Sequence, residues 1–225
     1  MGLFEQLLKR VGLDFSYEFD LRSAPFNEVD DGLFVGERPT PASVERMRNA
    51  GVTHVVSCLE ESEQDSTAFL EAHFEVLRLN VRDSIREDIA SAFQTSHAFL
   101  KDAPVALVHC RAGVSRSVTL TIAQRMQTHG ESFWVAFEHV RARRPEALPN
   151  IGFASQLQRF EFELDPRRRS MHPSSLANYL RTIACVPMPM EEIERMLRDH
   201  NFDAAAALLA TFDDEIPRVV RGVRL

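Results

Sequence analysis

Short apolar runs alternate with helical patterns along the first three quarters of the chain. Runs of strand length predict strands at residues 32–36, 52–59, 74–81 and 105–108. Apolar residues at helical spacing predict helices at residues 40–49, 87–102, 115–128, 132–143 and 150–163. Because strands and helices alternate in this order, the pattern predicts an α/β fold.

The pattern changes after residue 163. Asp165-Pro166 with three following arginines, and then Pro173, interrupt any helical face, so we expect a linker at residues 164–175. Residues 176–225 are expected to form a helical C-terminal extension. Its clearest part is a helical hairpin at residues 190–212, with Asp203 as the cap of the second helix. The extension is either a separate small unit, faintly similar to ubiquitin-associated helical modules, or a pair of helices packed on the main domain.

Composition and charge narrow the classes of function. The 225 residues are 44% apolar and 26% charged, which is typical of a globular protein. The net charge of -7 argues against a nucleic-acid partner, since such proteins need a basic face. We expect no transmembrane segment and a cytoplasmic location, with the nucleus as a second compartment. The three cysteines, Cys58, Cys110 and Cys185, have no metal-like spacing, so neither a metal site nor a disulfide framework is expected.

The candidate chemistry lies where the strand ending at Val108 meets the following helix. Cys110 and Arg116 stand six positions apart, across a loop that contains Gly113 and opens a helix. The backbone N–H groups of such a loop point into one concavity and form an anion site together with the helix dipole. The same positive potential favours a thiolate at Cys110, and the planar guanidinium of Arg116 can hold two phosphate oxygens.

The wider segment resembles a known signature. His109, Gly113, Ser115 and Ser117 stand at fixed offsets from Cys110, which a chance match would not reproduce. The segment is similar to the His-Cys-x-x-Gly-x-Ser-Arg-Ser signature of the dual-specificity branch of the cysteine-based protein tyrosine phosphatases. The resemblance covers residues 29–163 and leaves residues 1–28 as an N-terminal extension. It implies a central mixed sheet flanked by helices and marks the chain as a small atypical member of the family.

The resemblance also implies residue roles. Cys110 would be the nucleophile and Asp83 the acid, then the base for water, while Ser117 would stabilise the departing thiolate. His109 would order the loop, and Asn150 matches a supporting position. The phosphate-binding residues would be those of the loop itself: Arg111, Ala112, Gly113, Val114, Ser115 and Arg116.

Some of these residues have simpler interpretations. Asp83 could cap a helix beginning near Ile85. Cys58 is expected in the core. Arg141, Arg143 and Arg144 fit either an acidic-substrate patch or a helix end that complements its dipole, and they are left outside the site.

The resemblance implies an enzyme without cofactor that hydrolyses phosphotyrosine and phosphoserine or phosphothreonine on proteins. Phosphorylated proteins are then the expected substrates. The loop interior lacks the lysines of phosphoinositide phosphatases in the same superfamily. Two alternatives stay open: a phosphoprotein-binding or scaffold module whose C-terminal helices recruit a protein partner, and a phosphatase for a non-protein ester.

Overall fold

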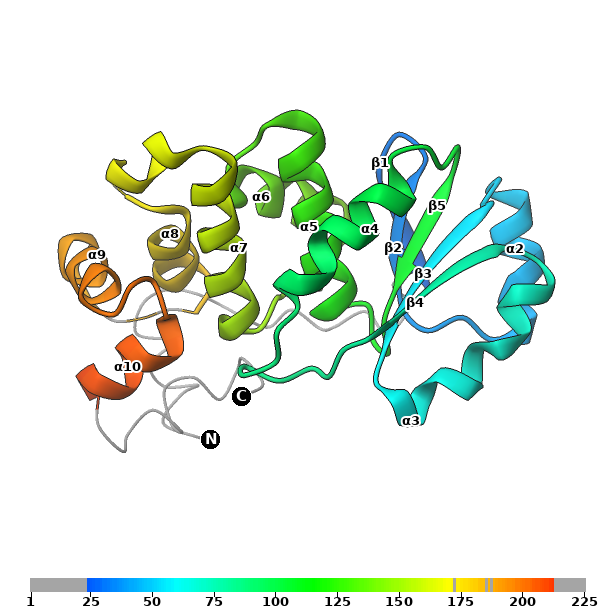
Figure 1. Ribbon diagram of the computed structural model, residues 1–225, viewed down its shortest axis with the longest axis horizontal. Helices are drawn as coiled ribbons and strands as arrows, with labels where there is room; N and C mark the ends of the chain where they lie inside the picture. Colours follow the sequence, from blue (N-terminus) through cyan, green and yellow to red (C-terminus); the bar gives the residue numbers. More distant parts are fainter. Residues whose placement is uncertain (1–23, 172, 185, 187, 213–225) are drawn as a thin grey trace.

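The computed structural model describes residues 24–171, 173–184, 186 and 188–212, and within these residues one sheet organises the fold (Figure 1). The strands run in the order β1-β2-β5-β3-β4. Only β1 is antiparallel to its neighbour, and the β2–β5, β5–β3 and β3–β4 pairs are parallel, so the expected mixed sheet is confirmed. The strands are β1 (Phe26–Asp30), β2 (Leu33–Gly36), β3 (His54–Leu59), β4 (Glu75–Asn80) and β5 (Ala106–His109).

Helices cover both faces of this sheet (Figure 1). One face carries η1 (Pro41–Ser43), α2 (Val44–Asn49), α3 (Glu61–Gln64) and η2 (Asp65–Ala72). The other carries η3 (Ala90–Ala92), α4 (Phe93–Leu100), α5 (Arg116–His129), α6 (Phe133–Arg143) and α7 (Ile151–Leu164). No helix among the described residues is long and apolar enough to cross a membrane.

The alternating direction of side chains along β3 and β5 explains why helices cover both faces of the sheet. Val55 on β3 and Leu107 on β5 belong to the smaller apolar cluster under α2, whereas Val56 and Val108, one position later, belong to the larger cluster under α5. Successive side chains of a strand point to opposite faces, so runs that are apolar throughout need cover on both.

The C-terminal helices share the larger core. They are α8 (Ser175–Thr182), α9 (Met190–Asp199) and α10 (Ala204–Phe212), preceded by the 3-10 helix η4 (Pro166–Ser170). Leu176, Leu197 and Phe202 belong to the same buried cluster as Val108 of the sheet. The structure therefore differs from the expectation of a separate unit and agrees with the alternative, in which the helices pack on the main domain. Asp203 caps α10 as predicted, since its Oδ1 accepts from the amide of Ala206 at 3.0 Å.

Some features of the fold differ from what the sequence pattern predicted. β1 has a single buried residue, Val29, so it gives almost no periodic signal, and it crosses the expected end of the N-terminal extension at residue 28. Residues 1–23 of that extension and Cys185 lie outside the described residues. α8 begins at Ser175, the last residue of the expected linker, and otherwise lies within residues 176–225, the expected helical extension.

The expected helix at residues 87–102 begins later, and residues 81–89 are irregular. The side chain of Gln156 on α7 accepts from the amides of Ile89 and Ala90, which removes these donors from a helical pattern. No helix begins at Ile85, so Asp83 does not have the capping role considered above.

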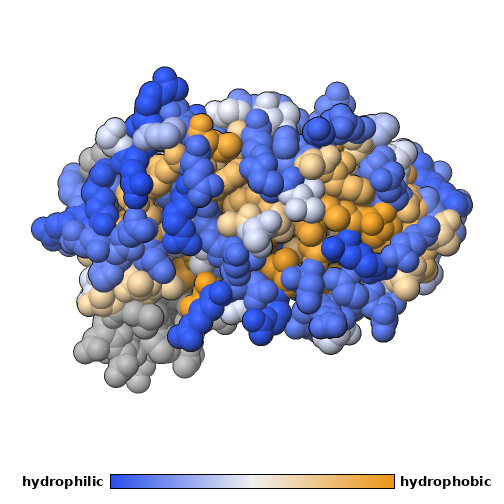
Figure 2. Space-filling view, viewed as in Figure 1, coloured by the Kyte–Doolittle hydropathy of each residue, from blue (hydrophilic) through white to orange (hydrophobic). Residues whose placement is uncertain are grey.

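Figure 2 shows that the surface over the C-terminal helices is mostly hydrophilic, whereas apolar residues gather over the half of the view that contains the sheet. There β4 forms the edge of the sheet with half-buried side chains.

Candidate active site

The phosphate loop, residues 110–116, connects the buried strand β5 to the first turn of α5. Gly113 has a φ of +67°, and a Cβ there would lie 2.4 Å from the backbone of Gly36 and 2.5 Å from Arg144. Only glycine tolerates both the left-handed conformation and this crowding. The carboxyl ends of parallel strands are the usual place for ligands in such sheets, and the loop lies there.

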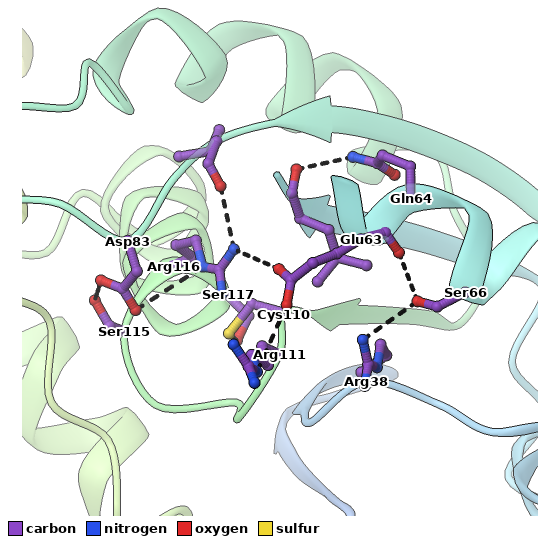
Figure 3. A network of polar contacts seen from close by, with 12 residues as sticks. Arg38, Glu63, Gln64, Ser66, Asp83, Cys110, Arg111, Ser115, Arg116 and Ser117 are labelled. Carbon is purple, nitrogen blue, oxygen red and sulfur yellow. Dashed lines mark hydrogen bonds and ion pairs between the residues drawn. The ribbon is translucent and has the colours of Figure 1, made fainter. Parts of the chain in front are cut away.

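The sulfur of Cys110 lies inside this loop. The residue is only 2% exposed, and its Sγ accepts from the amide of Gly113 at 3.3 Å and from Ser117 Oγ at 3.2 Å. The Gly113 donor belongs to the loop, and the Ser117 donor belongs to the first turn of α5, where Ser117 lies beside Cys110 (Figure 3). These two donors and the N-terminus of α5 surround the sulfur with positive electrostatic potential.

The guanidinium of Arg116 is buried beside the sulfur. Its NH1 donates to the carbonyl oxygen of Val81 at 3.2 Å and to Glu63 Oε2 at 3.4 Å. Its Nε lies 3.8 Å from Asp83 Oδ2, an ion pair without a hydrogen bond. Burial lowers the Arg116 pKa, but the negative charges of Cys110, Asp83 and Glu63 outweigh burial, and the net shift is upward. The arginine is thus a fixed cation.

Asp83 lies beside Arg116 and Ser115 (Figure 3), on the irregular segment between β4 and η3, residues 81–89, which we call the acid loop. Its side chain is 40% exposed. Oδ1 accepts from Ser115 Oγ at 2.8 Å and from Asn150 Nδ2 at 3.0 Å, and the amide of Asn150 donates to Ser115 Oγ at 3.2 Å. The predicted acid, a loop serine and the supporting asparagine therefore form one hydrogen-bonded group.

His109 is fully buried beneath the loop. Burial lowers its pKa from 6.5 to about 4, so the ring is neutral at pH 7. Its Nδ1 donates to the carbonyl oxygen of Cys110 at 3.3 Å, because a carbonyl can only accept. The contact fixes the backbone of the nucleophile, which is compatible with the ordering role that the sequence resemblance implied.

Two residues of the site were not selected from the sequence. Glu63 on α3 accepts from Arg116, and its Oε1 lies 3.5 Å from Arg111 Nε at the exposed rim. No sequence signal pointed to it, since α3 itself was not predicted.

Arg144 is the second. It is 2% exposed, its Nε donates to the carbonyl oxygen of Gly113 at 2.6 Å, and its NH2 donates to that of Ala112 at 3.4 Å. Leaving Arg144 outside the site as a helix-end charge was therefore wrong: it holds the phosphate loop from below. Arg141 and Arg143 instead contact Phe137 and the carbonyl oxygen of His139.

Cys58 lies in β3 and is fully buried, in agreement with the core interpretation. Burial, and then the nearby charge of Cys110, raise the pKa of its thiol, so it stays protonated.

The comparisons with known proteins agree with this geometry. The family model "Dual specificity phosphatase, catalytic domain" matches residues 33–163, which is more than half of the chain. The chain belongs to the dual specificity phosphatase family. The curated relatives in this family are named as dual specificity protein phosphatases.

Individual relatives fall in the same family. The Drosophila melanogaster dual specificity protein phosphatase MPK-4 is 32% identical over 79% of the chain, which spans 48% of that protein. The Arabidopsis thaliana dual specificity protein phosphatase 1B is 34% identical over 60% of the chain and 81% of its own length. Among solved structures, human DUSP28 has a TM-score of 0.57 at 31% identity, covering 63% of this chain and 96% of its own.

Another solved structure bears on the alternatives. The human tyrosine phosphatase-like serine/threonine/tyrosine-interacting protein has a TM-score of 0.57 at 31% identity, covering 60% of this chain and 95% of its own. The family fold thus occurs in a protein named for interaction.

Proposed function

We propose that this chain hydrolyses phosphotyrosine and phosphoserine or phosphothreonine on proteins through a phosphocysteine intermediate at Cys110. The observation that carries the proposal is the arrangement around the sulfur of Cys110. This sulfur accepts from Gly113 and Ser117, the cation of Arg116 lies beside it, and the carboxyl of Asp83 lies 3.8 Å from that cation. A nucleophile, an anion clamp and a proton donor meet in one place, as phosphate transfer requires.

In the first step the sulfur attacks phosphorus. The S–P bond forms as the P–O ester bond breaks, and the carboxyl proton of Asp83 passes to the departing oxygen. The two-pronged guanidinium of Arg116 and the loop amides hold the equatorial oxygens, where charge is greatest. Because Glu63 and the Val81 carbonyl already fix Arg116, little reorganisation is needed during the step.

In the second step water attacks phosphorus, and Asp83, now a carboxylate, takes its proton. The S–P bond breaks, and its electron pair returns to the sulfur of Cys110. Ser117 Oγ, 3.2 Å from this sulfur, stabilises the thiolate as it leaves. Inorganic phosphate and the starting enzyme result.

Short connections around the loop favour dual specificity. Within the described chain, two residues separate β1 from β2, and four separate β2 from η1. In this part of the described chain, no long segment surrounds the site and deepens it. A shallow site admits the short phosphoserine and phosphothreonine side chains as well as phosphotyrosine.

The test is turnover of one purified preparation against phosphotyrosine, phosphoserine and phosphothreonine peptides and phosphoinositides. We expect metal-independent hydrolysis of the phosphopeptides that vanadate blocks. Cys110→Ser should reduce turnover to background while phosphopeptide binding is kept, because serine at neutral pH holds its proton. Wild-type turnover by Cys110→Ser would exclude the phosphocysteine, and preference for phosphoinositides would favour the non-protein alternative.

The alternative is a scaffold function, in which the C-terminal helices bind a protein partner. It needs a helical surface that can act without the catalytic core, whereas α8 and α10 bury apolar residues in that core. Binding of a partner by the Cys110→Ser protein through exposed α9 residues such as Glu191 and Arg195, without any turnover by the wild type, would favour it.

A further inference from the structure

The carboxyl of Asp83 depends on two donors for its direction. The acid loop has no regular secondary structure, and Asp83 is half exposed, so its own backbone imposes little order. Ser115 Oγ and Asn150 Nδ2 both donate to Oδ1. Whatever fixes these two donors therefore fixes the proposed acid.

Both donors are tied to a single peptide group, the one that joins Pro149 to Asn150. Its N–H donates to Ser115 Oγ at 3.2 Å, and its carbonyl oxygen, on Pro149, accepts from Tyr179 Oη at 2.5 Å. A peptide group is planar, so a bond that holds its oxygen also sets the direction of its N–H. Tyr179 and Asp83 are thus linked through one rigid unit and one serine hydroxyl.

Tyr179 is itself enclosed by the core. It lies on α8, outside the matched family domain, and is completely buried. Its ring packs edge-on against Phe137 at 5.1 Å and lies 5.7 Å from Phe133. Burial raises the pKa of its hydroxyl above the usual 10, so the group is a neutral donor at every pH at which the enzyme would work.

We propose that Tyr179 is a positioning residue for the general acid, so that a helix of the C-terminal extension takes part in the reaction of the catalytic domain. The inference rests on the proposed function. Without the hydroxyl, the Pro149–Asn150 peptide loses the hydrogen bond that fixes its orientation. Ser115 and Asn150 then orient the carboxyl of Asp83 less accurately, and transfer of its proton to the leaving oxygen becomes slower.

Tyr179→Phe in the full chain tests the proposal, because it removes one oxygen and keeps the ring. The readout is kcat/KM for aryl phosphates whose phenols range from strongly to weakly acidic. Weakly acidic phenols need a proton to depart, so their kcat/KM should fall about five- to tenfold, the effect of one lost hydrogen bond. Esters of strongly acidic phenols should change less than about twofold.

Ser175→Ala is the matched control. Ser175 is also a buried hydroxyl on α8, but it donates to Glu161 Oε2 at 2.6 Å and has no link to Asp83. Each protein is assayed below its own unfolding temperature. The control should leave the dependence on the leaving group unchanged. A Tyr179→Phe loss that is equal for all leaving groups, or equal to that of Ser175→Ala, overturns the positioning role.

The double variant Asp83→Ala/Tyr179→Phe gives a second readout. Once the acid is absent, removing its support should not steepen the leaving-group dependence beyond that of Asp83→Ala alone. A further steepening would contradict the proposal. Failure of the proposed function would look different, since wild-type protein would then show no turnover that depends on Cys110.

Discussion

At the scale of single residues, the site is a set of donors around one sulfur. Ser117 stands directly after Arg116, yet its side chain points at Cys110 while the arginine reaches toward Val81 and Glu63. Successive positions at a helix start project in different directions, so neighbours in sequence can act on different atoms of one reaction. Ser117 Oγ donates to the sulfur, which leaves phosphorus in the second step, so we expect its largest contribution in that step.

We therefore expect Ser117→Ala to form phosphoenzyme normally and to hydrolyse it about 10–100-fold more slowly, since a hydrogen bond to a charged group is lost from the departing thiolate. Rapid-quench measurement of phenol release should show a burst of one equivalent per enzyme followed by slow turnover.

Thr121→Val is the control for this prediction. Thr121 is a buried hydroxyl of the same helix, but it donates to the carbonyl oxygen of Ser117 and not to the sulfur. It should show no burst. A uniform loss in both steps of Ser117→Ala would show that the hydroxyl does not act on the leaving sulfur.

At the scale of elements, α7 holds the acid loop in place. Gln156 accepts from the amides of Ile89 and Ala90 and donates to the carbonyl oxygen of Glu87 at 2.8 Å. Gly152, in the first turn of α7, lets the loop backbone approach closely, for a Cβ there would lie 2.0 Å from the carbonyl oxygen of Ile85. The helix thus replaces the internal hydrogen bonds that the irregular loop lacks.

Gly152→Ala should push the acid loop away from α7. Overpacking of this kind costs about 1–3 kcal/mol in stability, and we expect a lower kcat/KM chiefly for weakly acidic leaving groups. Urea unfolding and the aryl phosphate series would measure the two effects.

Gly130→Ala is the control for Gly152→Ala, because it introduces backbone strain without displacing the acid loop. Gly130 ends α5 with a φ of +64°, and no atom lies within 4 Å of an added Cβ. This variant should lose about 1 kcal/mol with unchanged kinetics. If Gly152→Ala behaved in the same way, the contact with Ile85 would have no catalytic importance.

At the scale of the whole molecule, one core joins the catalytic domain to the C-terminal helices. Phe162 of α7 packs edge-on against Phe202 at 4.8 Å, and Phe133 and Phe137 of α6 surround Tyr179. Ser155 Oγ also accepts from the amide of Ala204 at 3.0 Å, which ties the start of α10 to α7. The C-terminal helices lie on the side of α6 and α7 that faces away from the sheet (Figure 1).

Removal of residues 165–225 should therefore destabilise the rest of the chain. Exposing three or more buried aromatic side chains corresponds to roughly 5 kcal/mol, a large part of the stability of a domain. The urea midpoint should fall steeply, and the truncated chain should associate through the uncovered face of α6 and α7, as size-exclusion chromatography would detect.

A chain ending at residue 164 with the midpoint and kcat/KM of the full chain would contradict the shared core. It would also restore the interpretation of the extension as a separate unit.

The sequence by itself determined the α/β class, four of the strands and the chemical centre, because these depend on local patterns. Cys110, Gly113, Arg116 and Ser117 are close in the chain, so a fixed spacing carries their geometry. The family resemblance added Asp83 and Asn150, which come from distant segments.

Tertiary structure alone decided what surrounds that centre. Glu63 and Arg144 contact the site from segments that are distant in the chain, and Tyr179 is linked to it through the Pro149–Asn150 peptide. No local pattern connects these residues to Cys110. The start of α4 and the place of the C-terminal helices were also decided by packing, because contacts from α7 override weak local preference. Hydrophobic periodicity in the sequence indicates which side of a helix is buried. Only the tertiary structure shows which element that side packs against.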